Sequence, residues 1–226
     1  MKALESDQPL IVYVDIKSPY AFVAIRPTLE LESSLGIRFD WRPLTLDIPS
    51  YLGSAKKVDG KVVESTRSEI QWKFLKYGYR DARRYAERQG YILKGTEKIW
   101  DSSIANIGIL WVVRNNRDRL KDYFEEVYPP FWKRELDIED FEVVENCLEK
   151  AGVDSKGFRE FCQSEGREVH DDLQAQLHPL GIFGVPTYIV GGKILFGREH
   201  LPLVRWLLKG SNGPAPDIAY EISDSI

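Results

Sequence analysis

The stretch Gly-Val-Pro-Thr-Tyr-Ile-Val-Gly-Gly-Lys-Ile-Leu-Phe, residues 184–196, decides the fold. The apolar run after the proline predicts a strand, and Gly191-Gly192 predicts a tight hairpin from which a second strand returns. A proline directly before a strand does not suit an ordinary central position in a sheet, because proline donates no hydrogen bond to a neighbouring strand. Its context, with a β-α-β start earlier in the chain and a Gly-Gly hairpin after it, leads us to expect a cis-proline at Pro186 that turns the backbone of Val185 outward, where it can pair with an extended peptide ligand. The alternative interpretation is a tight turn that binds no ligand.

The first part of the chain predicts a β-α-β unit. Residues 10–16 are apolar and β-branched, as in a buried strand, and residues 37–42 alternate between large apolar and charged side chains, as in a second strand. Between them, residues 20–35 predict a helix that ends at Gly36, and Pro27 is expected to kink or break it. Because the connections are short, we expect the two strands to be parallel.

The middle of the chain predicts a helical insertion. Residues 44–59 are typical of a loop, and almost all of residues 65–178 have helical periodicity. The sheet pattern returns only after Gly181, and a terminal helix is expected over residues 199–208. The insertion therefore separates the two parts of the sheet in the sequence.

The order of these elements predicts the architecture. A β-α-β unit, a helical block and a β-β-α unit give an α/β fold with a thioredoxin-like core and a large all-helical insertion. We assign residues 8–46 and 180–210 to the core and residues 47–179 to the insertion domain. Residues 211–226 are rich in Gly, Pro and Asp, and we expect a flexible or draped tail there.

Composition and charge exclude several classes of function. Of the 226 residues, 43% are apolar and 29% charged, which is typical of a folded domain rather than of a disordered chain. The formal net charge is −4 with acids and bases mixed, so nucleic acid is not expected as a partner. Residues 1–8 are polar and unlike a secretory signal, and no apolar run reaches the ~20 residues that a membrane span needs. We expect a cytoplasmic protein that does not bind a membrane.

Cysteine and histidine are too few and too scattered for a metal site. The chain has two cysteines, Cys147 and Cys162, and three histidines far apart in the sequence. Their spacing matches no metal-binding motif. In a reducing compartment we expect both cysteines to be free thiols that pack as small apolar groups.

Ser18 occupies the position at which we expect the catalytic chemistry. It follows the first predicted strand and precedes Pro19, which suits the first position of a helix, so Ser18 is the expected N-cap. The free N–H groups and the dipole of a helix N-terminus stabilise an anion such as a thiolate. No cysteine lies nearby in the sequence and no triad-like motif accompanies Ser18, so we expect its hydroxyl to donate a hydrogen bond to a bound thiolate. A role as N-cap alone is the alternative, and the two roles are compatible.

Several short motifs together resemble a known family. They occur in this order: Ser-Pro-Tyr-Ala-Phe-Val-Ala (18–24), Trp-Arg-Pro-Leu (41–44), Asp81 with Arg84 and Ala86, Gly-Val-Pro-Thr (184–187) and Phe-Gly-Arg-Glu-His-Leu (196–201). The sequence resembles the 2-hydroxychromene-2-carboxylate isomerase and kappa-class glutathione transferase group of the DsbA-like thioredoxin superfamily. The resemblance covers roughly residues 10–208, and it depends on the order and spacing of the motifs rather than on any single one.

The resemblance implies a glutathione site. Ser18 is similar to the family serine that holds the glutathione thiolate, and Val185, before Pro186, is similar to the residue whose backbone pairs with the cysteinyl part. Glu199 stands where the family has an aspartate that meets the γ-glutamyl ammonium, and the adjacent Arg198 is placed to reach a carboxylate. An ordinary solvated helix start is the alternative for Arg198 and Glu199. Lys73 is the nearest candidate for a family lysine that binds glutathione, one residue out of register.

The function that we expect is a glutathione-dependent isomerase of a conjugated aromatic keto acid. The protein then needs no nucleophile of its own, which agrees with the residues around Ser18. Two alternatives remain open: a kappa-like glutathione transferase or peroxidase, and a non-catalytic thioredoxin-like protein that binds a ligand at the Val185-Pro186 edge. A dithiol oxidoreductase is disfavoured. The relatives imply a homodimer, with a small aromatic substrate as the other partner.

Overall fold

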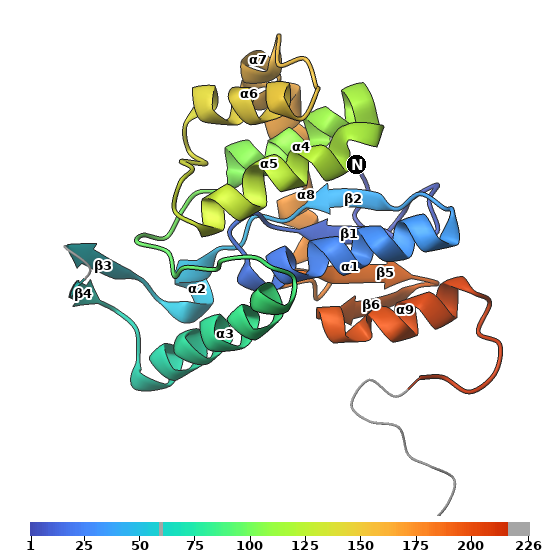
Figure 1. Cartoon of the computed structure of the whole chain (residues 1–226), viewed down its shortest axis with the longest axis horizontal. Helices are drawn as coiled ribbons and strands as arrows, with labels where there is room; N and C mark the ends of the chain where they lie inside the picture. The colour runs from blue at the N-terminus through green and yellow to red at the C-terminus, as the bar shows by residue number, and fades with distance from the viewer. Residues whose placement is uncertain (59–60, 217–226) are drawn as a thin grey trace, which may run out of the picture.

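The structure is a computed structural model, and it describes residues 1–58 and 61–216 (Figure 1). Its central sheet has the strand order β2-β1-β5-β6, built from β1 (Ile11–Val14), β2 (Asp40–Pro43), β5 (Thr187–Val190) and β6 (Lys193–Phe196). Strands β1 and β2 are parallel, whereas β5 runs antiparallel to β1 and β6 antiparallel to β5. The predicted β-α-β unit and the predicted hairpin at Gly191-Gly192 are both confirmed.

Helix α1 (Pro19–Leu35) begins and ends where the sequence predicts. Gly36 ends it with a left-handed backbone, at a φ of 63°. A break at Pro27, one of the two predicted outcomes, is wrong, because the helix continues through this residue. Proline removes the N–H that would bond to the carbonyl four residues earlier, which is that of Val23. Gln89 replaces it, because its Nε2 donates to the Val23 carbonyl at 2.8 Å.

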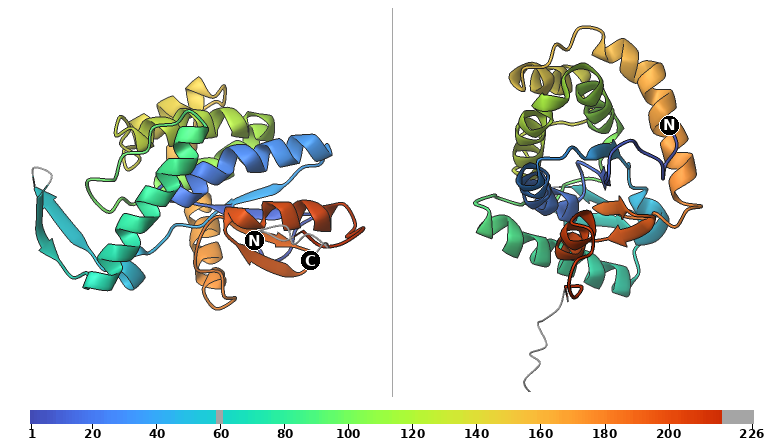
Figure 2. Two further views of the ribbon diagram at one scale, coloured as in Figure 1. Left: turned by 60° about the horizontal axis from the view of Figure 1, so that its bottom comes forward. Right: turned by 90° about the vertical axis from the view of Figure 1, so that its right-hand side faces the viewer.

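The insertion is not entirely helical, which corrects the prediction for residues 44–59. After the short helix α2 (Ile48–Leu52), strands β3 (Ala55–Val58) and β4 (Lys61–Ser65) pair as an antiparallel hairpin that extends away from the sheet (Figures 1 and 2). The sequence nevertheless contains a signal for this hairpin. Asp59-Gly60 is a strong turn dipeptide between two segments that contain valines.

The rest of the insertion is helical, as predicted. Its helices are α3 (Glu69–Arg88), α4 (Ser103–Asn116), α5 (Leu120–Trp132), α6 (Phe141–Lys150), α7 (Phe158–Gln163) and α8 (Glu165–Leu177). Helix α8 leads from the insertion back to the sheet and lies on the face opposite α1 and the terminal helix α9 (Leu201–Leu208) (Figure 2). Helix α9 starts two residues later than predicted, after a 3₁₀ turn at Arg198–His200. Most of the predicted tail, residues 217–226, lies outside the described residues.

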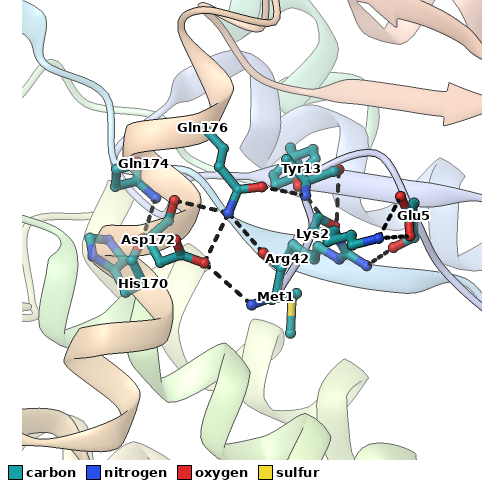
Figure 3. Close-up of polar contacts among 10 residues, drawn as sticks. Met1, Lys2, Glu5, Tyr13, Arg42, His170, Asp172, Gln174 and Gln176 are labelled. Atoms are coloured by element: carbon teal, nitrogen blue, oxygen red, sulfur yellow. Dashed lines mark hydrogen bonds and ion pairs between the residues drawn. The ribbon is translucent and has the colours of Figure 1, made fainter.

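Arg42 fixes the first residues of the chain to the edge strand β2. Its side chain is only 3% exposed and its terminal nitrogens donate to the carbonyls of Lys2 and Glu5, each at 2.7 Å (Figure 3). The same guanidinium pairs with Asp40 at 2.6 Å. Tyr13 adds a hydrogen bond from its hydroxyl to the carbonyl of Ala3 at 2.8 Å. This segment therefore lies beside an edge strand that would otherwise be open to pairing with another chain.

Replacing Arg42 with methionine is expected to lower the free energy of unfolding by about 3 kcal/mol. Removing one partner leaves Asp40 without its cation and two carbonyls without a donor. Urea denaturation measures the loss, and hydrogen exchange should show faster exchange of the amides of residues 2–5. Arg38→Met is the matched control, because this arginine is 61% exposed and pairs with Asp118 at the surface. Equal stability of the two variants would contradict the role of Arg42.

Candidate active site

A large cleft of about 1480 Å³ lies where the end of the sheet meets the insertion. Ser18 at the start of α1, Val185 before β5 and Leu46 after β2 line it from the core. Helix α3, the segment of residues 95–100 and the first hairpin strand, β3, line it from the insertion. The cleft therefore brings together the two positions that the sequence singled out, Ser18 and Val185.

Ser18 caps α1 and faces the loop before β5. Its side chain is 3% exposed, and its Oγ accepts a hydrogen bond from the Ala21 N–H at 3.2 Å. The hydroxyl donates to the Val185 carbonyl, with 3.4 Å between the two oxygens. This distance is longer than the usual 2.5–3.0 Å for a hydroxyl donor, so the bond is weak and the proton is available for a stronger acceptor. The predicted N-cap is confirmed.

The bond between Val185 and Pro186 is cis, as predicted from the sequence. Val185 is 3% exposed, and its N–H has no hydrogen-bond partner within the described part of the chain. The preceding residue, Gly184, has no Cβ, and a Cβ there would lie only 2.6 Å from the ring of Phe196. A buried N–H without a partner is unfavourable. The main chain at Val185 is therefore suited to an extended ligand that offers a carbonyl.

Asp15 organises the segment that carries Ser18, and the sequence analysis did not identify it. It is fully buried and accepts hydrogen bonds from the side chains of Ser102 and Asn106 and from the backbone N–H groups of Lys17 and Leu46. Four donors on three separate segments thus converge on one carboxylate. The only sequence signal is an acidic residue inside the predicted strand at 10–16, which periodicity alone does not explain.

Tyr20 remains a neutral phenol beside Ser18. Burial raises its pKa to about 12, and the carboxylate of Asp81, which accepts a hydrogen bond from the Tyr20 hydroxyl at 3.4 Å, adds to the effect. Asp81 in turn pairs with Arg84 at 3.5 Å along α3. Tyr20 therefore presents an apolar ring to the cleft at neutral pH and adds no negative charge near Ser18.

The remaining sequence-predicted ligands lie outside the lining of the cleft. Arg198 stacks on Tyr85, with the guanidinium carbon 3.2 Å from the ring centroid, and Glu199 is exposed on the same 3₁₀ turn. Lys73 is 67% exposed and pairs with Glu69 at 2.6 Å along α3. Pro186 is buried behind Val185. Roles for these four residues in binding stay predictions.

The cleft wall is aromatic and positively charged. Its aromatic side chains are Tyr20, Tyr51, Trp72, Phe74, Tyr77, Tyr79, Trp100, Phe183 and Phe196. Its charged side chains are the cations Lys17, Lys57, Arg67, Lys76, Arg83 and Lys98 and the acids Asp47 and Glu97. Six cations against two carboxylates favour an anionic ligand, and the rings favour a flat, conjugated one. Residue patterns along the chain do not show which helix faces meet at a cleft, so they did not predict this aromatic wall.

The two cysteines take no part in this site. Cys147 in α6 and Cys162 in α7 are 2% and 1% exposed, and both are free thiols. Burial raises the pKa of each to about 11, so neither is a thiolate at neutral pH. The prediction that both pack as small apolar groups is confirmed.

Native protein is therefore expected to resist alkylation by iodoacetamide at pH 8. Both thiols should react once the chain is unfolded in guanidinium chloride, because the thiolate is the reactive form and burial is then lost. Intact mass counts the added groups under each condition. Full labelling of either cysteine within minutes under native conditions would show that the buried state of that thiol is wrong.

None of the helices in residues 1–58 and 61–216 combines the length and the apolar character needed to cross a membrane. Within the same residues, no three His, Cys, Asp or Glu side chains gather closely enough to hold a metal ion.

Comparisons with known proteins place the chain in a family. No curated protein sequence matches it. Among solved structures, a 2-hydroxychromene-2-carboxylate isomerase is similar at 19% identity with a TM-score of 0.64, covering 89% of this chain and 93% of the other. A probable DsbA oxidoreductase from Streptomyces coelicolor is similar at 17% identity with a TM-score of 0.62, covering 92% of each chain.

A third similar structure contains glutathione. It is the cytosolic disulfide reductase DsbM from Pseudomonas aeruginosa with GSH, at 14% identity and a TM-score of 0.59, covering 90% of this chain and 94% of the other. At these identities the likeness shows the fold alone. The pattern of a DSBA-like thioredoxin domain matches residues 9–209, nearly the whole described chain. The chain therefore belongs to the family of DSBA-like thioredoxin domains.

Proposed function

We propose that this protein is a glutathione-dependent isomerase of a conjugated aromatic keto acid. The observation that carries the proposal is the pairing of Ser18 Oγ with the Val185 carbonyl at 3.4 Å across the cleft corner. At this corner Ser18 offers a weakly held hydroxyl proton, and the backbone N–H of Val185 has no partner among the described residues. They match a ligand that has both a sulfur anion and a peptide backbone, as glutathione does.

Ser18 has the central role in this proposal. Its hydroxyl donates a hydrogen bond to the sulfur, while the Ala21 N–H that it accepts holds the Oγ in place. The N-terminal dipole of α1 favours negative charge at the same point. A hydrogen bond to a charged acceptor is worth about 1.5–3 kcal/mol, so Ser18 lowers the pKa of a bound thiol by roughly one to two units.

In this proposal, the remaining residues of the site bind glutathione and orient the substrate. Bound glutathione would supply a thiolate nucleophile for reversible addition to the conjugated double bond of the substrate. Val185 pairs with the peptide backbone through its N–H, as in strand addition. The aromatic wall around Trp100 and Tyr79 holds the flat substrate against the corner, and the cations of the wall attract its negative charge.

Disulfide reduction, the activity named for the similar structure DsbM, has no support from the residues at this corner. That chemistry needs a thiolate in the protein, and Ser18 stands where it would lie. Cys147 and Cys162 are buried in α6 and α7. A transferase or peroxidase would use the same bound thiolate, but it would consume glutathione.

The proposal is tested by following a cis-trans pair of a conjugated aromatic keto acid by absorbance, with and without glutathione. An isomerase converts the pair only when glutathione is present and leaves the glutathione concentration unchanged by mass spectrometry. Stoichiometric loss of glutathione to an adduct would assign a transferase instead. No conversion in either case, with glutathione bound, would favour the non-catalytic alternative.

The homodimer that the resemblance implies is a proposal as well. Val63, Ile70 and Phe74, on β4 and α3, are more than half exposed, which is unusual for apolar side chains so close together in the sequence. Sedimentation velocity measures the oligomeric state directly. A single monomeric species at all concentrations would rule the dimer out.

A further inference from the structure

Two half-buried arginines of the cleft have no acidic partner. Arg67 lies just before α3 and Arg83 within it, and both line the cleft. Neither forms an ion pair with any acid in residues 1–58 and 61–216, whereas exposed arginines such as Arg84 do. Half-buried cations are usually paired, because burial penalises an isolated charge.

Among the described residues, each guanidinium donates a hydrogen bond through its Nε atom alone. Arg67 Nε donates to the Gly53 carbonyl at 3.2 Å, and Arg83 Nε donates to the Leu93 carbonyl at 2.9 Å. A guanidinium has five N–H groups, so the terminal nitrogens of both side chains keep their donors free among the described residues. A carboxylate with two oxygens matches such a pair of terminal nitrogens.

Aromatic rings hold both side chains in place. The Arg67 guanidinium lies 5.0 Å from the ring centroid of Trp72, and that of Arg83 lies 5.8 Å from the ring centroid of Tyr79. Stacking of this kind restricts a long side chain before a ligand arrives. Burial lowers the pKa of Arg67, which is the sign of a positive charge that lacks compensation.

Lys57 adds a third cation to the same wall. Its Nζ donates to the Thr96 carbonyl at 3.2 Å, and the Thr96 hydroxyl bonds to the Tyr79 hydroxyl at 3.1 Å. Glu97, one of the two acids of the cleft wall, pairs with Arg134 at 3.2 Å. We call Lys57, Arg67 and Arg83 the basic cluster.

We propose that the basic cluster binds the carboxylate of the conjugated aromatic acid, with the rings of Trp72 and Tyr79 beside the conjugated system of the same ligand. This inference rests on the proposed function. It adds the residues that make the cleft bind an aromatic acid more tightly than a neutral analogue of that acid. Glutathione also carries carboxylates, so the test must separate the two ligands.

The test uses trans-cinnamate and its neutral amide, cinnamamide, as probes in calorimetric titrations, with glutathione titrated separately. Wild type is expected to bind cinnamate at least tenfold more tightly than cinnamamide, because a charged hydrogen-bonded pair is worth about a factor of ten or more. In the double variant Arg67→Gln, Arg83→Gln this preference should disappear. The dissociation constant for glutathione should change less than about twofold.

Arg88→Gln is the matched control, because Arg88 lies on the same helix, stacks on Tyr85 and does not line the cleft. It should keep the preference for cinnamate. If the double variant does not fold, rising salt in wild type replaces it, and the preference for cinnamate should fall as the charges are screened.

Three results would overturn the proposal. They are an equal affinity of wild type for the two probes, an unchanged preference in the double variant, and a loss of glutathione affinity with cinnamate binding intact. Cinnamate binding needs no turnover, so it is measured even if glutathione does not bind. Failure of the proposed function and failure of the basic cluster are therefore distinguishable.

Discussion

Replacing Ser18 with alanine is expected to lower turnover about 100-fold while changing the dissociation constant for glutathione less than about threefold. The hydroxyl acts on the sulfur anion, and removing one such donor typically costs 10²–10³ in rate. The affinity depends mainly on contacts elsewhere, including the Val185 N–H. Steady-state kinetics and calorimetry on the same preparation separate the two effects. The pKa of bound glutathione should rise toward that of the free thiol.

Ser18→Thr is the control for this variant, because it keeps a hydroxyl and a capping oxygen in nearly the same position. It should recover most of the turnover if the added methyl group is accommodated. Unchanged turnover in Ser18→Ala would remove Ser18 from the mechanism and leave it as an N-cap alone. Equal losses in rate and affinity would instead assign its effect to ligand binding.

Replacing Asp15 with alanine is expected to lower the free energy of unfolding by more than about 3 kcal/mol. Four donors converge on this fully buried carboxylate, and three of them, all except the Asn106 amide, have no other acceptor among the described residues. An unsatisfied buried donor costs about 1–3 kcal/mol. Urea denaturation measures the loss. The variant that remains folded should also bind glutathione more weakly, because the segment from Asp15 to Ser18 is no longer fixed.

Asp15→Asn tests the same network with the shape preserved. Its amide turns one acceptor into a donor that faces other donors, so we expect a smaller but clear loss of stability. Asp118→Ala is the control, because Asp118 is 77% exposed and pairs only with the exposed Arg38. An effect of Asp15→Ala no larger than that of Asp118→Ala would show that the network does not stabilise the fold.

Local sequence signals predicted the core well because they act over a few residues. The cap at Ser18, the left-handed Gly36 and the Gly191-Gly192 hairpin each follow from the conformational preferences of one or two residues. The cis bond at Pro186 required the wider context, a proline between a helical block and a strand. These elements together were enough to predict a thioredoxin-like core, whereas the antiparallel pairing of β5 with β1 was not predicted.

The features that were not predicted depend on contacts between residues far apart in the sequence. Pro27 stays inside α1 because Gln89, more than sixty residues away, satisfies the carbonyl that the proline frees. The buried donors around Asp15 come from three segments that only the folded chain brings together. That Arg67 and Arg83 form no ion pair within residues 1–58 and 61–216 depends equally on distant neighbours, since both look like ordinary surface residues in the sequence.

The most direct test of the account is the thiol pKa of glutathione bound to the wild-type protein, followed by the ultraviolet absorbance of the thiolate across a pH series. The account predicts saturable binding and a bound thiol whose pKa lies roughly one to two units below that of free glutathione, with the shift absent in Ser18→Ala. Binding with an unchanged pKa, or no binding at millimolar glutathione, would contradict the assignment of Ser18 as the residue that stabilises the thiolate.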